Sequence, residues 1–303
     1  MFGMMGVARM AGQPGGAFSP LSLFRNGEQG SWYDPSDFSS MFQYGIGFTP
    51  VTAVGQPVGL ILDKRLGLAL GSELITNGSF ETDTSGWTAG GNAVLSVDAG
   101  RLKISCSPPG NSWAYQAITT VVGQWYKLSF TFTAGTSAAP YIFVSSEAGS
   151  GATDLDSSLI GTLTNGTFEG YFLASATTTY IKPFLATSGL TNGYFDSISV
   201  KSIAGNHATQ ATAAARPVVS APHYLTFDGI DDLMSTTFPN LGSACTIARA
   251  VPGVGASILT AQTIGAGTWT DSTNHAGLVI IDRALTAGET AALTAYLDAK
   301  AGV

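Results

Sequence analysis

The sequence predicts an all-β protein with two β-sandwich (jelly-roll) domains, an extended N-terminal arm and a short C-terminal helix. Between residues 73 and 203, short runs of alternating apolar and polar residues are interrupted by Gly, Asn, Pro or Ser clusters about every ten residues, a spacing typical of sandwiches and jelly rolls. Charged residues make up only 11% of the chain and glycines number 38, so Ser, Thr, Asn and Gly must form much of the surface. A clear helical pattern occurs only near the C-terminus.

Residues 1–30 form the first expected element. They are rich in Gly, Met and Pro and show little periodicity. A segment without an amphipathic face cannot bury itself, so we expect an anchoring arm that becomes ordered on a partner surface. No basic residue precedes its apolar start and glycines interrupt it, so it does not match a secretory signal peptide.

The most regular strand is expected at 126–133, where Tyr126, Leu128, Phe130 and Phe132 alternate with polar residues. Alternation with a period of two places one face in a core and the other in solvent. Comparable runs cover 93–97, 102–106, 115–118, 141–144, 170–174, 180–185 and 195–200. After an Ala/Thr-rich connector, further strands are expected at 224–227, 245–250 and 277–281.

The C-terminal helix has recognisable signals at both ends. Thr286 and Glu289 have the spacing of a capping box, and Gly302 is placed to end the helix. The apolar positions on one helical face are Leu293, Tyr296 and Leu297.

Composition and charge exclude two classes of function. The net charge of −7 provides no basic face to displace counterions from phosphates, so we expect no nucleic-acid partner. The most apolar stretch, 58–70, is interrupted by Asp63, Lys64 and Arg65, so no membrane insertion is expected.

The two cysteines, Cys106 and Cys245, lie far apart in sequence and in different expected domains. We expect two isolated buried thiols rather than a disulfide. This cysteine usage fits a β-rich protein that is made and kept in a cytoplasm.

Three sets of segments resemble known families. The segments ELITNGSFETDTSGWTAG (73–90) and YFDSISV (194–200) resemble the first and last strands of the galactose-binding-like jelly rolls in carbohydrate-binding modules of the family 4/9/22 type. The segments YLTFDGIDDLM (224–234) and LVIIDRALTAGETAALTAYL (278–297) resemble those of a concanavalin/laminin-G-like sandwich. The segments at 32–43, 50–64 and 205–218 resemble those of bacteriophage tail or virion proteins.

The laminin-G-like resemblance also implies a domain order. In that family a first strand leads to a phrase similar to Gly205-Asn206-His207, but here the jelly roll intervenes between Asp63 and this phrase. We therefore expect an anchoring arm at 1–30, a discontinuous sandwich at 31–65 plus 204–303, and an inserted jelly roll at 66–203. Insertion at a surface loop costs little because loop-closure entropy grows only logarithmically with length.

Sugar binding requires exposed aromatic faces that can stack on a sugar ring. The candidate residues are Trp113, Tyr115 and Trp125. Trp113 and Tyr115 lie in and just after the loop at 108–112, which is the best place for an exposed platform. Core packing or a protein interface remains an equal alternative, and Trp125 fits either role.

A structural calcium ion is implied by the carbohydrate-binding-module resemblance. By that resemblance Glu81 and Asp196 are the candidate ligands, together with backbone carbonyls, since Ca²⁺ prefers hard oxygen donors. The alternative is that both are ordinary turn or edge residues. No other cofactor is expected.

No catalytic motif occurs in the sequence, so we expect no catalytic residues and no enzyme activity. The histidines His207, His223 and His275 are scattered, and we expect each in a loop or turn. The acidic cluster Asp228, Asp231 and Asp232 could hold a glycosidase acid and nucleophile, although a structural turn is the favoured interpretation.

These observations favour a structural protein of a tailed-phage virion, such as a fibre, spike or decoration component. It would be assembled in the host cytoplasm, contact capsid, collar or tail proteins through its arm, and adsorb weakly to host-surface glycans. By analogy with other phage appendages we expect a homo-oligomer, and specifically a trimer. The alternative is a glycan-active enzyme, such as a polysaccharide depolymerase, or its carbohydrate-binding subunit.

Overall fold

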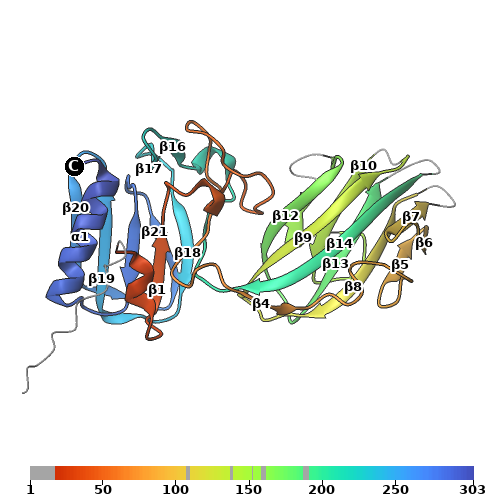
Figure 1. Cartoon of the computed structure of the whole chain (residues 1–303), viewed down its shortest axis with the longest axis horizontal. Helices are drawn as coiled ribbons and strands as arrows, with labels where there is room; N and C mark the ends of the chain where they lie inside the picture. The colour runs from red at the N-terminus through yellow and green to blue at the C-terminus, as the bar shows by residue number, and fades with distance from the viewer. Residues whose placement is uncertain (1–17, 107–109, 137–138, 152, 158–161, 187–190) are drawn as a thin grey trace, which may run out of the picture.

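The computed structural model describes residues 18–106, 110–136, 139–151, 153–157, 162–186 and 191–303 (Figure 1). Antiparallel strands form five sheets in these residues, together with one α-helix at the C-terminal end. The predicted all-β class is therefore confirmed. None of the helices in these segments is long and apolar enough to cross a membrane.

The first group of sheets is built from the two ends of the described chain, and we call it the terminal sandwich (residues 18–65 and 204–303). One sheet has the order β1 (Gly30–Tyr33), β22 (Leu278–Ile281), β19 (Gly242–Val251) and β20 (Gly255–Ile264). The other has the order β2 (Met41–Phe42), β3 (Leu60–Ile61), β15 (Ala208–Thr209), β18 (Met234–Phe238) and β21 (Gly267–Asp271). A two-stranded sheet, β16 (Val218–Ser220) and β17 (Tyr224–Thr226), and the 3-10 helices η1 (Pro20–Phe24), η2 (Phe38–Ser40) and η4 (Ala213–Ala215) complete it.

The second group lies between these segments in the chain, and we call it the inserted sandwich (residues 66–203). Its five-stranded sheet has the order β11 (Leu155–Asp156), β10 (Ala139–Ser145), β13 (Thr178–Ala186), β8 (Ser112–Thr119) and β5 (Thr88–Gly91). Its six-stranded sheet contains β12 (Gly166–Leu173), β9 (Trp125–Ala134), β14 (Asn192–Ile203), β7 (Leu102–Cys106) and β6 (Ala93–Val97), with β4 (Leu70–Glu73) also on β14.

Strand pairing separates the two groups, because in the described segments each sheet draws its strands from one group alone (Figure 1). A domain is a part of the chain that folds on its own, and strand pairing alone does not show this property. The domain boundaries at 65/66 and 203/204 therefore remain a prediction.

The core of the inserted sandwich follows from strand alternation. In β9 the residues Tyr126, Leu128, Phe130 and Phe132 are all buried, while the residues between them are partly exposed. Phe132 packs against Phe195 of β14 with ring centroids 5.0 Å apart. The period-two pattern thus places its aromatic side chains between the two sheets, where they bury the most apolar surface.

Helix α1 (Ala287–Ala301) confirms the predicted capping signals. The backbone N–H of Glu289 donates to the Thr286 hydroxyl at 3.2 Å, and the Glu289 carboxylate accepts from the Thr286 N–H at 2.8 Å. Gly302 ends the helix at φ 82°, in the left-handed region that favours glycine. Leu293 and Leu297 are fully buried, and Figure 1 shows the helix lying along β19 and β20.

The N-terminal part differs from the expected arm. Residues 18–29 are folded onto the terminal sandwich: Leu23 and Phe24 are buried in the same apolar cluster as Leu293 and Leu297 of α1. The segment PLSLF at 20–24 is too short to show a clear helical or strand period, but it supplies Leu23 and Phe24 to this cluster. Residues 1–17 of the expected arm lie outside the described residues.

The cysteines agree with expectation. Cys106 and Cys245 are both free and buried. Cys106 belongs to the core of the inserted sandwich and Cys245 to that of the terminal sandwich.

The two sandwiches meet at a packed junction. Phe42, Leu60 and Leu62 of the terminal sandwich form one apolar cluster with Tyr171 and Ile203 of the inserted sandwich. The face of β3 that carries Leu60 is thus covered by the inserted sandwich rather than by solvent.

A loop of the terminal sandwich extends this junction. Phe48 joins the core of the inserted sandwich and lies 6.2 Å from Phe130, measured between ring centroids. The backbone N–H of Tyr171 donates to the carbonyl of Ile46 at 3.0 Å. A side chain at Gly170 would collide with the Phe48 ring, 2.6 Å from an added Cβ, so glycine permits this close approach.

Candidate functional site

A cluster of aromatic residues lies on the outer face of the five-stranded sheet of the inserted sandwich. In β8 the alternate residues Ser112, Ala114, Gln116 and Ile118 are buried, so Trp113 and Tyr115 point to the opposite face. The register pairs Trp113 with Phe184 of β13, and Phe184 with Tyr141 of β10. We call this surface the aromatic face; it consists of Trp113, Tyr115, Tyr141, Phe143, Tyr180 and Phe184.

The rings of the aromatic face contact one another in two groups. Trp113 stacks on Phe184 with centroids 5.8 Å apart, and Phe184 lies 4.8 Å from Phe143. Tyr115 and Tyr180 meet edge to face at 5.9 Å. These spacings are those of favourable aromatic pairs, so the rings hold one another in fixed orientations.

Trp113 differs from the exposed loop residue that we expected. It lies in a strand, and its indole rests on the backbone of β5, where an added Cβ at Gly90 would come within 2.3 Å of the ring. Its indole N–H donates to the carbonyl of Ala148 at 3.1 Å. Trp113 is therefore half-buried and supports the aromatic face more than it exposes a platform. Residues 107–109 of the expected loop lie outside the described residues.

The segment 146–151 covers part of the aromatic face. Lys182 points to this side of β13 and is fully buried, and its ammonium donates to the carbonyls of Glu147 (3.1 Å), Gly149 (2.8 Å) and Gly151. Burial lowers the pKa of Lys182 to about 8, although the nearby Glu147 carboxylate opposes this shift. Sequence reasoning missed this lysine because its partners are backbone carbonyls more than thirty positions away.

As a consequence the aromatic face is only partly open. Phe143 and Phe184 are buried, whereas Tyr115, Tyr141 and Tyr180 are partly exposed, as Trp113 is. A partly exposed tyrosine offers an apolar ring for the C–H surface of a sugar and a hydroxyl for hydrogen bonding. The structure therefore brings Trp113 and Tyr115 together, with Tyr180 as a neighbour that sequence reasoning did not select.

Trp125, the third candidate, lies elsewhere. It begins β9 at the junction of the two sandwiches, half-buried, with its ring centroid 5.4 Å from that of His207. It borders one cleft of about 360 Å³ together with Tyr44 and Tyr171. It also borders a second cleft of about 210 Å³. The role of all three candidates in sugar binding remains a prediction.

The candidate calcium ligands have oxygen atoms to offer. Within the described segments the Glu81 carboxylate takes part in no hydrogen bond or ion pair, and an added Cβ at Gly100 would lie 3.5 Å from its Oε2 atom. Asp196 Oδ1 accepts only the N–H of Ser197, at 2.6 Å. Carboxylates without other partners suit Ca²⁺ chemically. Among the described residues, neither Glu81 nor Asp196 belongs to a group of three acidic, His or Cys side chains close enough to share a metal ion, so the calcium site remains a prediction.

The acidic cluster forms a turn. Asp228 Oδ1 accepts the backbone N–H groups of Ile230 (2.8 Å), Asp231 (3.2 Å) and Asp232 (3.2 Å). These hydrogen bonds stabilise the carboxylate and lower the pKa of Asp228. The three carboxylates lie within 4.8 Å of one another, but they line neither of the two clefts that Trp125 borders.

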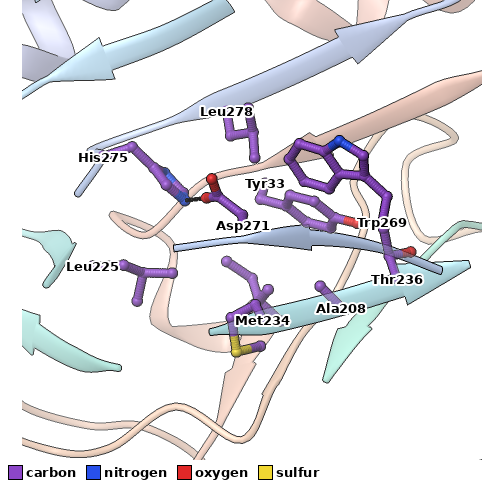
Figure 2. Close-up of a pocket in the computed structure, with 10 residues that line it drawn as sticks. Tyr33, Ala208, Leu225, Met234, Thr236, Trp269, Asp271, His275 and Leu278 are labelled. Carbon is purple, nitrogen blue, oxygen red and sulfur yellow. Dashed lines mark ion pairs between the residues drawn. The ribbon is translucent and has the colours of Figure 1, made fainter. Parts of the chain in front are cut away.

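A small enclosed pocket lies inside the terminal sandwich (Figure 2). Asp271 pairs there with Nε2 of His275 at 3.1 Å and with Nη2 of Arg249 at 2.8 Å. Burial alone would raise the pKa of Asp271, but the His275 hydrogen bond and the Arg249 charge outweigh it and lower the pKa. The volume of about 10 Å³ excludes a substrate, so this group stabilises the core.

His207 lies between β14 and β15 and His275 between β21 and β22, so both are in connecting segments as expected. Both are nevertheless buried, each only 2% exposed. Their burial was not visible in the sequence because neither lies in a run of alternating apolar residues.

No known protein family and no curated protein matches the sequence. Several solved structures are similar over part of the chain. A family 4 carbohydrate-binding module, at 20% identity and a TM-score of 0.34, covers 42% of this chain and 99% of its own. The tandem CBM22-1–CBM22-2 domains of Xyn10C from Paenibacillus barcinonensis, at 9% identity and a TM-score of 0.33, cover 70% of this chain and 89% of their own. The enzymatically active domain of bacteriophage CBA120 tailspike protein 4, at 15% identity and a TM-score of 0.32, covers 43% of this chain but only 21% of its own.

Proposed function

We propose that this chain is a non-enzymatic structural protein of a tailed-phage virion that adsorbs weakly to host-surface glycans through the aromatic face. The observation that supports glycan adsorption is the partly exposed Tyr115–Tyr180 pair, whose two rings meet edge to face at 5.9 Å. An apolar ring of this kind stacks on a sugar, and its hydroxyl adds directional hydrogen bonds.

The virion role is supported by the surface and by the sequence. With 11% charged residues, the chain has little charge to steer a substrate and much neutral surface to pack against neighbouring subunits. The phage-like segments at 32–43, 50–64 and 205–218 point the same way. A fibre, spike or decoration component repeated in many copies would turn a weak single site into firm adsorption.

A glycan array displaying host-surface polysaccharides tests the adsorption. The chain is presented on a multivalent support, because single-site binding is expected to be weak. Tyr115→Ala and Tyr180→Ala are expected to abolish the signal. Tyr194→Ala is the matched control, since Tyr194 is a half-exposed tyrosine on the other sheet of the same sandwich. Binding that survives Tyr115→Ala and Tyr180→Ala would contradict the proposed site.

The virion role has a direct test of its own. Purified phage particles are digested for mass spectrometry and reconstructed by electron microscopy. Peptides of this chain and density for two linked sandwiches are expected at the capsid, collar or tail. A particle without this chain would overturn the virion role and leave glycan binding to be judged by the array.

The enzyme alternative rests on the cluster of Asp228, Asp231 and Asp232. Each is replaced singly by Asn, and depolymerisation of host polysaccharide is followed by release of reducing ends. We expect no activity in the unaltered chain. Activity that disappears with one of these substitutions would establish the alternative.

A further inference from the structure

The second cleft at the junction has a different chemistry from the aromatic face. We call it the junction cleft; Trp125, His207, Thr209, Ser235, Thr237 and Thr268 contribute to its walls. Among the described residues that line it, none is Asp, Glu, Lys or Arg. Its volume is about 210 Å³. This is below the roughly 300–1,000 Å³ of sites for drug-sized ligands, so the cleft suits a single small ring.

A row of hydroxyl groups forms one wall. Ser235 pairs with Thr209, and Thr237 pairs with Thr268, so the four side chains stand together on the outer face of the sheet. None of the four hydroxyls makes a hydrogen bond to another described residue. Each can both donate and accept, which is the pattern that a polyhydroxylated ligand requires.

The hydroxyl row continues a surface that is apolar elsewhere. Next to Thr209 the same face of the sheet carries Leu60, which is buried against Tyr171 of the inserted sandwich. The face therefore changes from an apolar contact to an open row of hydroxyls at the point where the two sandwiches diverge. Core packing does not explain exposed hydroxyls in this position.

His207 supplies a donor without an acceptor. Its Nδ1 accepts the backbone N–H of Asp63 at 2.9 Å. Burial, together with the Arg65 charge, lowers the pKa of His207 to about 3, so the ring is neutral at neutral pH. Because Nδ1 carries the lone pair, the proton resides on Nε2. That buried Nε2–H has no hydrogen-bond partner among the described residues, which is unusual for a buried polar group unless water or a ligand completes it.

Trp125 provides an apolar surface beside this donor. Its ring tilts against His207 and also lines the cleft. The preceding residue, Gln124, donates from Nε2 to the carbonyl of Ile203 at 2.8 Å. This bond ties the start of β9 to the last residue of β14 and fixes the position of Trp125.

We propose that the junction cleft binds one neutral hexopyranose unit of a glycan, with the ring on Trp125, a sugar oxygen accepting from His207 Nε2–H, and the sugar hydroxyls on the row of Ser and Thr. A neutral sugar is favoured over an acidic one because no cationic side chain lines the cleft. This site is separate from the aromatic face and goes beyond the proposed function, which needs only that face.

The test uses the full chain with ¹⁵N-labelled tryptophan, whose five indole N–H signals are resolved by NMR. Methyl glycosides of glucose, galactose and mannose are the neutral probes, and glucuronic acid is the charged counterpart. The Trp125 signal, assigned with Trp125→Phe, is expected to shift saturably with at least one neutral glycoside, with a Kd of about 1–10 mM. Glucuronic acid is expected to bind at least about tenfold more weakly.

Two variants test the named contacts. His207→Asn keeps an acceptor for the Asp63 N–H and removes the Nε2 donor. Thr237→Val combined with Thr268→Val removes two exposed hydroxyls at nearly constant shape, so it keeps the test decisive even where His207→Asn fails to fold. Each is expected to weaken binding by about tenfold, the loss typical of one or two missing hydrogen bonds. Thr260→Val, at an exposed threonine of β20, is the matched control and is expected to change nothing.

The same spectra separate this inference from the proposed function. A Trp113 shift without a Trp125 shift would support the aromatic face and overturn the junction site. Trp125 also borders the larger cleft, which Thr237 and Thr268 do not line, so a Trp125 shift that weakens in the double threonine variant supports the junction site. Absence of any Trp125 shift up to about 50 mM glycoside, beyond the range of weak sugar sites, would overturn the inference. Unchanged affinity in the double threonine variant would also overturn it.

Discussion

The backbone N–H of Asp63 donates to Nδ1 of His207 at 2.9 Å, although 144 positions separate the two residues. The Asp63 carboxylate, which is fully buried, accepts in turn from the N–H of Asn206 at 2.7 Å and from that of Trp32 at 2.8 Å. It also pairs with Nε of Arg65 at 3.0 Å. These bonds join the chain segment that precedes the inserted sandwich to the segment that follows it.

We expect Asp63→Ala to destabilise the chain strongly. The substitution leaves the nearly buried Arg65 side chain and three backbone N–H groups, those of Trp32, Arg65 and Asn206, without their acceptor. Breaking a buried pair in this way costs about 3–5 kcal/mol of unfolding free energy. Urea denaturation measures it, with Asp98→Ala as the control, because the exposed Asp98–Lys103 pair contributes only about 0–1 kcal/mol. Equal effects of the two substitutions would contradict the role of Asp63.

The burial of the neutral His207 ring predicts that the folded chain loses stability in acid. Burial and the Arg65 charge lower its pKa from 6.5 to about 3, so the folded chain keeps the ring neutral while the unfolded chain binds a proton below about pH 6.5. The stabilisation is therefore complete above pH 6.5 and is lost as pH falls toward 3. The slope contributed is at most about 1.4 kcal/mol per pH unit. Denaturation curves measured across this pH range give the unfolding free energy as a function of pH. This free energy should depend less steeply on pH for His207→Asn, and an unchanged pH dependence would refute the assignment.

Lys182 predicts local release of the segment 146–151. Lys182→Met keeps the apolar stem and removes the three hydrogen bonds to the carbonyls of Glu147, Gly149 and Gly151. Amide hydrogen exchange in this segment is expected to rise by about tenfold or more, since its closed form loses those bonds. Lys103→Met is the control, because the interactions of Lys103, a partly exposed ion pair with Asp98 and a contact with the Tyr194 ring, do not involve the segment 146–151. Unchanged exchange would show that other contacts hold the segment.

Calcium binding predicts a ligand-dependent gain in stability. At a calcium concentration about 100 times the Kd, the unfolding free energy is expected to rise by about 2.7 kcal/mol relative to the chelated chain. Glu81→Gln and Asp196→Asn should each remove this gain. Glu169→Gln, at an exposed ion pair, should retain it. The same calcium effect in all variants, or none in the unaltered chain, would sink the assignment.

The strands that could be predicted are those whose alternation reflects a single buried face. In β9, apolar and polar residues alternate without interruption, so the sequence alone indicates both the strand and its inner face. By contrast, β20 is composed largely of Ala, Thr and Ser and has few buried positions. This segment is a strand because it pairs with β19, and its amino-acid composition does not reveal that pairing.

The candidate site could be predicted only in part. Trp113 and Tyr115 were recognisable as aromatic residues near a strand, but the support of Trp113 by Gly90 depends on pairing between β5 and β8. Lys182 and His207 act through backbone groups more than thirty and more than one hundred positions away. Contacts of this range are set by the fold and leave no local pattern in the sequence.

The adsorption of phage particles to host cells tests the central claim most directly. Particles carrying Tyr180→Ala are compared with unaltered particles and with particles carrying Tyr194→Ala, and free phage is counted over time. The account predicts that Tyr180→Ala slows adsorption by about tenfold or more, because a loss at each weak site is multiplied over many copies, while Tyr194→Ala has no effect. Equal adsorption by all three kinds of particle, each shown to contain the chain, would contradict it.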